Sequence, residues 1–120
     1  MQNSHDKMLE EIPIIKKTYE LYKLYYGFLE LFPKKDKYAL GAKCELYIIT
    51  VLELLLEARN LPREEKIAIV RQASVKFDTL KILLRMAKDL NFLENKKYLS
   101  LQAHIQEIGR QLGGWQKSLS

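Results

Sequence analysis

Side chains that could perform acid–base chemistry, nucleophilic attack or metal binding are few and widely spaced in this chain. It holds one cysteine, Cys44, and two histidines, His5 and His104. Cys44 lies in an apolar stretch, where a single cysteine usually packs as a small hydrophobic residue. A lone cysteine also forms no internal disulfide. Nucleophilic catalysis, which needs an activated group beside a base, is therefore not expected.

Two carboxylate arrangements remain as candidates for chemistry. His104 and Glu107 stand three residues apart, which resembles the ligand spacing of di-iron four-helix bundles, but those sites need Glu-x-x-His on two helices and further carboxylates. Here the order is reversed and the pair occurs once. Glu53 and Glu57 lie one helical turn apart, and basic neighbours favour a solvated strip over an acid–base pair. Since no glycine-rich loop could hold a phosphate either, the sequence predicts no enzyme, no metal site and no cofactor.

The basic residues point to a different chemistry, the binding of a polyanion. Lysines and arginines number 20 against 15 acids, which gives a net charge of +5. Between positions 66 and 88, six cations accompany a single acid, Asp78. Lys81, Arg85 and Lys88 share one helix face, although like charges at this spacing destabilise an isolated helix by roughly a few tenths of a kcal/mol per pair. Two interpretations fit: an external anion that neutralises the cluster, or an ordinary solvated surface.

Helices must hold these residues at this spacing, and the apolar pattern predicts four helices. Apolar residues recur at three- and four-residue steps over about 14–32, 36–60, 63–90 and 95–118. Pro13 and Pro62 suit the first positions of the first and third helices. Four amphipathic helices with short connections predict an all-α, antiparallel up-down-up-down four-helix bundle, in a single domain over residues 1–120.

The apolar surface of the predicted helices is larger than a single four-helix core can bury. The first helix carries two adjacent apolar stripes, which cover about half of its circumference, and the second helix is apolar over most of its length. The surplus predicts a subunit interface and therefore a homo-oligomer. A thick core within a single chain is the alternative.

The location of the protein is predicted from what the chain lacks. The richest apolar run, at 46–56, is too short to span a bilayer. The N-terminal sequence MQNSHDK has no signal-peptide pattern, and a single cysteine suits a reducing compartment. We therefore expect a cytoplasmic protein that does not associate with membranes.

The segment EIGRQLGGWQKS at 107–118 breaks the helical pattern that contains it. Gly109, Gly113 and Gly114 fall in the last turns, where each glycine destabilises a helix interior by roughly 1 kcal/mol relative to alanine. Trp115, the only tryptophan, follows directly. The segment predicts the close of the fourth helix, with a glycine cap, tight packing at the small residues and a tryptophan docked on the core.

Three segments together resemble a known family. FPKKDKYALG at 32–41, LKILLRMAKDLNFL at 80–93 and EIGRQLGGWQKS at 107–118 occur in this order with the spacing of a bundle. They resemble the accessory variability determinant proteins of diversity-generating retroelements. That family is related to the four-helix-bundle proteins encoded in intervening sequences of bacterial 23S ribosomal RNA genes. The resemblance covers about residues 30–118, and its last segment is the most specific.

The resemblance implies a function that periodicity alone does not give. Proteins of this family are four-helix bundles that assemble into a homopentameric barrel, have no catalytic site, and bind nucleic acid and the reverse transcriptase of the element. They support mutagenic retrohoming, in which an RNA template is copied with adenine-directed errors into a variable gene. Because the chain has no base-reading motif, we expect its binding to RNA or DNA to be weakly sequence-specific.

Candidate residues for binding nucleic acid or reverse transcriptase lie in or near the matching segments. They are Arg71, Lys81, Arg85, Lys88, Arg110 and Lys117. Arg71 is included on charge and helix position alone. Glu45, Glu53 and Glu57 make the second helix acidic, so a uniformly basic exterior is not expected. Two alternatives remain open: an intervening-sequence-type bundle with another role, and a structural oligomerisation module without affinity for nucleic acid.

Overall fold

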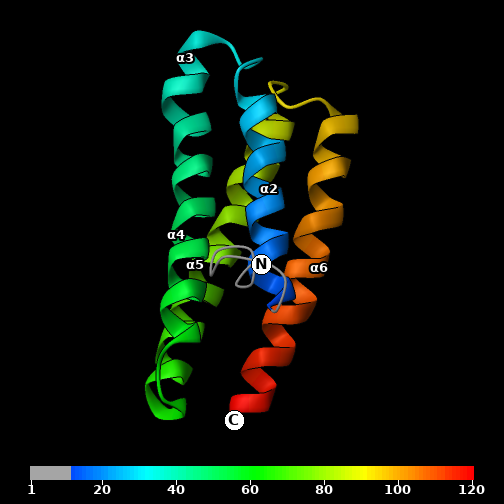
Figure 1. Ribbon diagram of the computed structural model, residues 1–120. Helices are drawn as coiled ribbons and strands as arrows, with labels where there is room; N and C mark the ends of the chain where they lie inside the picture. Colours follow the sequence, from blue (N-terminus) through cyan, green and yellow to red (C-terminus); the bar gives the residue numbers. More distant parts are fainter. Residues whose placement is uncertain (1–11) are drawn as a thin grey trace, which may run out of the picture.

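Four long helices form the protein, whose computed structural model describes residues 12–120. They are α2 (Pro13–Leu29), α4 (Ala42–Arg59), α5 (Arg63–Asp89) and α6 (Asn95–Leu119). Consecutive long helices run in opposite directions (Figure 1). Helices α2 and α5 each pack against both α4 and α6, so α2 and α5 occupy opposite corners of the bundle. The predicted all-α four-helix bundle is therefore confirmed.

The connection between α2 and α4 differs from the prediction. Helix α2 ends at Leu29, three residues before the predicted boundary, and the short helix α3 (Lys34–Asp36) and the π-helical segment η1 (Lys37–Gly41) lead into α4. Phe32 anchors the turn, because its buried ring packs edge-on against Tyr25 and Phe92, with centroid distances of 6.1 and 5.2 Å. A Cβ atom on Gly41 would lie 2.6 Å from Leu29 Cδ1. A larger side chain at position 41 would therefore displace the side chain of Leu29.

The core lies along the inner faces of the four helices. Helix α5 contributes Val70, Ala73, Phe77, Leu80, Leu84 and Ala87. Ile69 continues this stripe at a four-residue step from Ala73, so the apolar pattern predicts that it is buried, but it is only half-buried. Thr18 is the one buried polar residue within the described part of the chain, and its hydroxyl donates to the Ile14 carbonyl at 2.8 Å. The helical period thus locates the buried face of α5 correctly, except at Ile69.

The predicted glycine cap at the end of the fourth helix is wrong. Helix α6 continues without a break through all three glycines to Leu119, and no glycine in residues 12–120 has a positive φ. A Cβ on Gly109 would meet Phe77 at 3.5 Å, but one on Gly113 or Gly114 would meet nothing within 4 Å. Helix α2 begins at Pro13, across a groove from Gln111. The described part of α2 therefore does not extend alongside the last turns of α6.

The turn between α5 and α6 occurs close to the predicted position. Helix α5 ends at Asp89, and Asn91 adopts a left-handed conformation with φ of 67°. Asparagine tolerates this conformation better than most residues. The amides of Phe92 and Leu93 then donate to the carbonyl of Ala87, which satisfies the end of the helix. None of the described helices combines the length and the apolar character that crossing a membrane requires.

Candidate polyanion-binding surface

Three of the candidate cations lie together on the side of α5 that faces α6. The Lys88 ammonium lies over the ring of Tyr98 on α6, with its nitrogen 5.3 Å from the ring centroid. One and two turns earlier, Arg85 and Lys81 project from the same side of the helix. The nearby Tyr98 also helps to raise the pKa of Arg85. We call Lys81, Arg85 and Lys88 the basic flank.

Local acids accompany two of these cations, whereas the count over positions 66–88 includes Asp78 alone. Lys81 pairs with Asp78 and Arg85 pairs with Asp89, each with a nitrogen–oxygen distance of 3.1 Å. Hydrogen bonding to Asp89 and its charge raise the pKa of Arg85 above its ordinary value. All four side chains are exposed, and exposed ion pairs are weak because water and salt screen them. A phosphate can therefore replace the carboxylate at either cation.

Aromatic rings lie beneath the lysines of α5, which the linear sequence does not reveal. Along the sequence, the tyrosines concentrate in α2 and do not alternate with the charges of α5. In the folded chain, rings from α4, α5 and α6 approach these lysines, at nitrogen-to-centroid distances of 6.0, 5.6, 5.5 and 5.3 Å. In that order, the pairs are Lys66 with Trp115, Lys76 with Tyr47, Lys81 with Phe77, and Lys88 with Tyr98. Such contacts orient an ammonium group without neutralising its charge.

The other three candidate residues lie apart from the basic flank. Arg71 is exposed near the opposite end of α5, where it lines a small pocket of about 60 Å³ with Gln116 and Leu119 of α6. Arg110 projects from α6 and binds Glu107 through two nitrogens, one of them at 3.0 Å. Lys117 is exposed and forms no ion pair with any described residue. The six candidates therefore do not form one continuous site.

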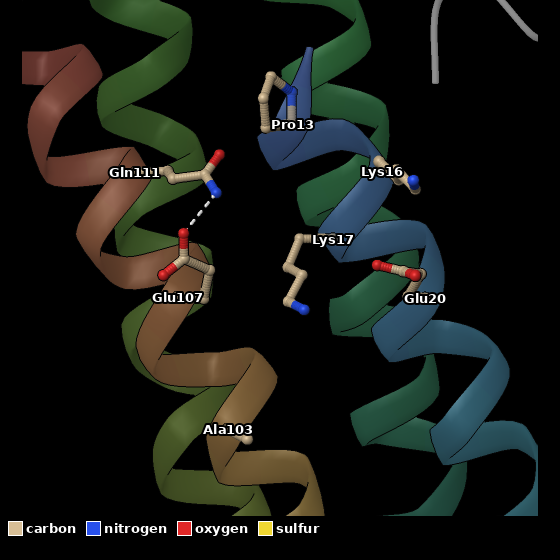
Figure 2. A pocket seen from close by; sticks show the side chains of 7 residues that line it. All are labelled: Pro13, Lys16, Lys17, Glu20, Ala103, Glu107 and Gln111. Carbon is tan, nitrogen blue, oxygen red and sulfur yellow. Dashed lines mark hydrogen bonds between the residues drawn. The ribbon is translucent and has the colours of Figure 1, made fainter. Parts of the chain in front are cut away.

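A groove of about 620 Å³ lies between the N-terminal half of α2 and the middle of α6 (Figure 2). Glu107 lies on its α6 wall, where hydrogen bonds from Arg110 and Gln111 lower the pKa of its carboxyl to about 2. Lys17 projects from α2 into the space between the two helices. Since the lining carries both positive and negative groups, the groove has no net preference for a polyanion. Its lining residues are Pro13, Lys16, Lys17, Glu20, Ala103, Glu107 and Gln111.

His104 and Cys44 were the other candidates for chemistry. Burial and the charge of Lys17 lower the pKa of His104, and its buried Nδ1 has no hydrogen-bond partner among the described residues. Glu107, its possible partner as a metal ligand, is instead engaged with Arg110 and Gln111. Cys44 is buried, and burial raises the pKa of its thiol to about 11. The thiol therefore stays protonated at neutral pH, and a protonated thiol is a poor nucleophile. His5 lies outside the described residues.

Comparison with known proteins agrees with the resemblance seen in the three sequence segments. A protein-family model described as bAvd-like, for bacterial Avd-like proteins, matches residues 12–119. The match includes all four long helices of the bundle. A search of curated proteins gives no match.

Proposed function

This chain belongs to the bAvd-like family, and we propose on that premise that it is a non-enzymatic accessory protein of a diversity-generating retroelement. In this role it binds reverse transcriptase and template nucleic acid and supports mutagenic retrohoming. It acts as a homopentamer. Family membership supports the reverse transcriptase as partner, and the apolar surplus of the helices supports the assembly.

The basic flank carries the nucleic-acid part of this proposal. Lys81, Arg85 and Lys88 rise from one side of a rigid helix, with the ring of Tyr98 beside them. Cations spaced one turn apart match a string of phosphates, and the exposed carboxylates beside two of them are easily displaced. The half-buried Tyr98 ring lies beneath the Lys88 ammonium and orients it. The flank therefore suits nucleic acid that is bound mainly through its backbone.

A triple substitution tests this proposal. Lys81→Gln, Arg85→Gln and Lys88→Gln together remove the three charges and leave the buried face of α5 unchanged. Fluorescence anisotropy with a labelled single-stranded RNA should show a loss of affinity of about tenfold or more at low salt. The slope of log affinity against log salt should fall by about 2, since each lost phosphate contact contributes roughly 0.7 to a single-strand slope.

The matched control removes the same charge elsewhere. Lys16, Lys34 and Lys35 are exposed and lie outside the basic flank, so their triple change to glutamine tests net charge alone. It should weaken binding much less than the flank variant. Equal losses in the two variants would mean that overall charge, and not the flank, binds the RNA. If the wild-type protein does not bind RNA even at low salt, the structural oligomerisation module becomes the better account.

Reverse-transcriptase binding needs a separate measurement. The wild-type protein, bearing an affinity tag, should retain the co-expressed reverse transcriptase of the same element after nuclease treatment. Nuclease removes RNA bridges, so retention then reports contact between the two proteins. Loss of the enzyme after this treatment would restrict the role of this chain to nucleic-acid binding.

A further inference from the structure

A pocket of about 230 Å³ lies between the end of α2 and the start of α4, away from the basic flank. Tyr26 and Leu29 line it from α2, and Tyr38 lines it from η1. Pockets for drug-sized ligands usually measure about 300–1,000 Å³, so this pocket suits a single flat ring system better than a larger molecule. Its other lining residues are Glu30, Lys37, Ala42 and Glu45. We call it the tyrosine pocket.

Two tyrosine rings give the tyrosine pocket its aromatic surface. Tyr26 is 53% exposed and Tyr38 is 71% exposed, so both rings are accessible to a ligand. The backbone that carries Tyr38 is tied to α2, because the buried hydroxyl of Tyr25 donates to the carbonyl of Gly41 at 2.8 Å. Gly41 also lies close to Leu29. An exposed ring on a fixed backbone is a surface on which a nucleobase stacks.

The charged groups of the tyrosine pocket are two carboxylates and one ammonium. Glu45 is half-buried, and one of its oxygens accepts a hydrogen bond from the Tyr22 hydroxyl at 3.1 Å, which holds this carboxylate in place. Its other oxygen has no hydrogen-bond partner among the described residues. The Lys37 nitrogen lies 5.9 Å from the centroid of the Tyr38 ring and pairs with no described acid. The pocket thus combines acceptors and a donor with aromatic rings.

Guanine matches this combination better than the other nucleobases do. Its Watson–Crick edge carries two adjacent donors, the N1–H and the N2 amino group, and then the acceptor O6. A carboxylate accepts both donors side by side, and a lysine donates to O6. Adenine and cytosine place an acceptor nitrogen next to their amino group, and uracil has carbonyl oxygens on both sides of its single donor. In these three bases, an acceptor faces the carboxylate and is repelled by it.

We propose that the tyrosine pocket binds a guanine base. The base stacks on Tyr38, its two donors bind Glu45, and its O6 accepts from Lys37. The base comes either from a free guanine nucleotide or from an unpaired guanine in single-stranded nucleic acid. In the second case the inference rests on the nucleic-acid binding of the proposed function, and it adds one selected base to contacts that are otherwise made with the backbone.

The phosphate attached to such a base also finds cations near the pocket. Lys43 directly follows Ala42 in α4, and Lys23 lies one turn before Tyr26 in α2. Both lysines are exposed. Together with Lys37 they outnumber the two carboxylates of the pocket, so a phosphate at the rim meets more positive than negative groups.

The first experiment uses nucleotides without any nucleic acid. Equilibrium dialysis of the full-length protein should show that guanosine 5′-monophosphate binds about tenfold more tightly than adenosine 5′-monophosphate. Glu45→Gln should abolish this difference. Glu53→Gln is the matched control, because Glu53 is exposed on the same helix outside the pocket, and this variant should retain the difference. If Glu45→Gln unfolds the chain, as circular dichroism would show, Tyr38→Ala replaces it and should weaken guanosine 5′-monophosphate binding, whereas Tyr38→Phe should not.

The second experiment places one guanosine in the centre of a short oligouridine RNA. Matched RNAs carry adenosine, cytidine or uridine at that position, so all four offer the same phosphates. The guanosine RNA should bind about tenfold more tightly than the uridine RNA, and Glu45→Gln should remove this preference. The triple variant of the basic flank should weaken all four RNAs and keep the preference.

The two experiments separate this inference from the proposed function. A preference for guanine in either experiment supports the pocket and identifies the source of the base. No preference in both, or a preference that Glu45→Gln leaves unchanged, overturns the inference. If the wild-type protein binds none of the four RNAs, the nucleic-acid part of the proposed function fails, and the nucleotide experiment alone then decides for or against the pocket.

Discussion

Two sides of helix α5 differ in what their side chains contact within a single chain. On the basic flank, Lys81 and Arg85 pair with carboxylates of their own helix, and Lys88 lies over Tyr98. On the side opposite the buried face of α5, which we call the outer stripe, Val75, Ile82 and Met86 project into solvent. A charged group is well solvated when exposed, whereas a row of exposed apolar side chains is unfavourable in water. The stripe therefore demands a partner more strongly than the charges do, even though the charges are the more conspicuous feature of the sequence.

The largest effect is expected when the outer stripe is disrupted and the basic flank is left intact. Val75→Glu combined with Ile82→Glu should convert the oligomer to a monomer. Its affinity for a long single-stranded RNA should then fall by about a hundredfold, because linked binding sites bind 10²- to 10⁴-fold more tightly than separate ones. Anisotropy with a long and a short RNA measures this effect, and the short RNA should show a much smaller loss. Equal losses on both RNAs would place phosphate contacts on the stripe itself.

A second prediction concerns the open glycines of α6. Gly113 and Gly114 are helical and have free space where a Cβ would stand. Gly113→Ala and Gly114→Ala should therefore stabilise the protein by about 0.5–1 kcal/mol each, measured by urea unfolding. If copies of the chain contact one another through the outer stripe of α5, assembly stays unchanged. An assembly defect in these variants would instead place the contact at the end of α6.

A third, smaller effect should follow when the acids beside the basic flank are removed. Asp78→Asn and Asp89→Asn release Lys81 and Arg85 from their ion pairs and raise the net positive charge by two. RNA affinity should rise several-fold at low salt, and the rise should disappear in high salt, where exposed charges are screened. The control, Glu30→Gln with Glu64→Gln, makes the same charge change away from the flank and should raise affinity less. No difference between the two variants would contradict a specific role for the flank.

The smallest effect is expected at Glu107, which lies on α6 away from both sides of α5. Its pKa is about 2 in the folded protein, below the value of 4.5 for an unperturbed glutamate. A group whose pKa is lowered on folding stabilises the protein above its unfolded pKa, and this contribution is lost as the pH falls through the folded value. Glu107→Gln should therefore be slightly less stable than wild type at pH 7, with the gap closing between about pH 4.5 and 2. Urea unfolding at several pH values measures the gap, and a constant gap would contradict the Arg110 and Gln111 contacts.

The helical period predicted most of the bundle because four long amphipathic helices repeat the same pattern. Leu80, Leu84 and Ala87 are buried as their spacing indicated. The π-helical entry to α4 was not predicted. Gly41 in this segment lies close to Leu29 of α2, and such an approach between helices is not visible in the local pattern. The end of α6 was misread, since local glycine propensity is overridden where the helix packs along α5 and buries Ile108, Leu112 and Leu119 around the glycines.

The candidate site was only partly predictable for a related reason. Helical spacing placed Lys81, Arg85 and Lys88 on one side of α5, as the structure has them. Asp89 was also within reach of Arg85 at a four-residue step, but it lay just outside the cluster counted in the sequence. The ring of Tyr98 comes from a different helix, so only the packing of α5 on α6 brings it to Lys88. Contacts within one helix are thus readable from sequence, whereas contacts between helices require the fold.

One measurement tests the division of roles on α5 most directly. Sedimentation velocity of the Lys81→Gln, Arg85→Gln, Lys88→Gln variant with labelled single-stranded RNA reports assembly and RNA binding in the same experiment. We expect the protein to sediment as the wild-type oligomer while the RNA sediments as free RNA. RNA that co-sediments with the variant as it does with the wild-type protein would contradict the account.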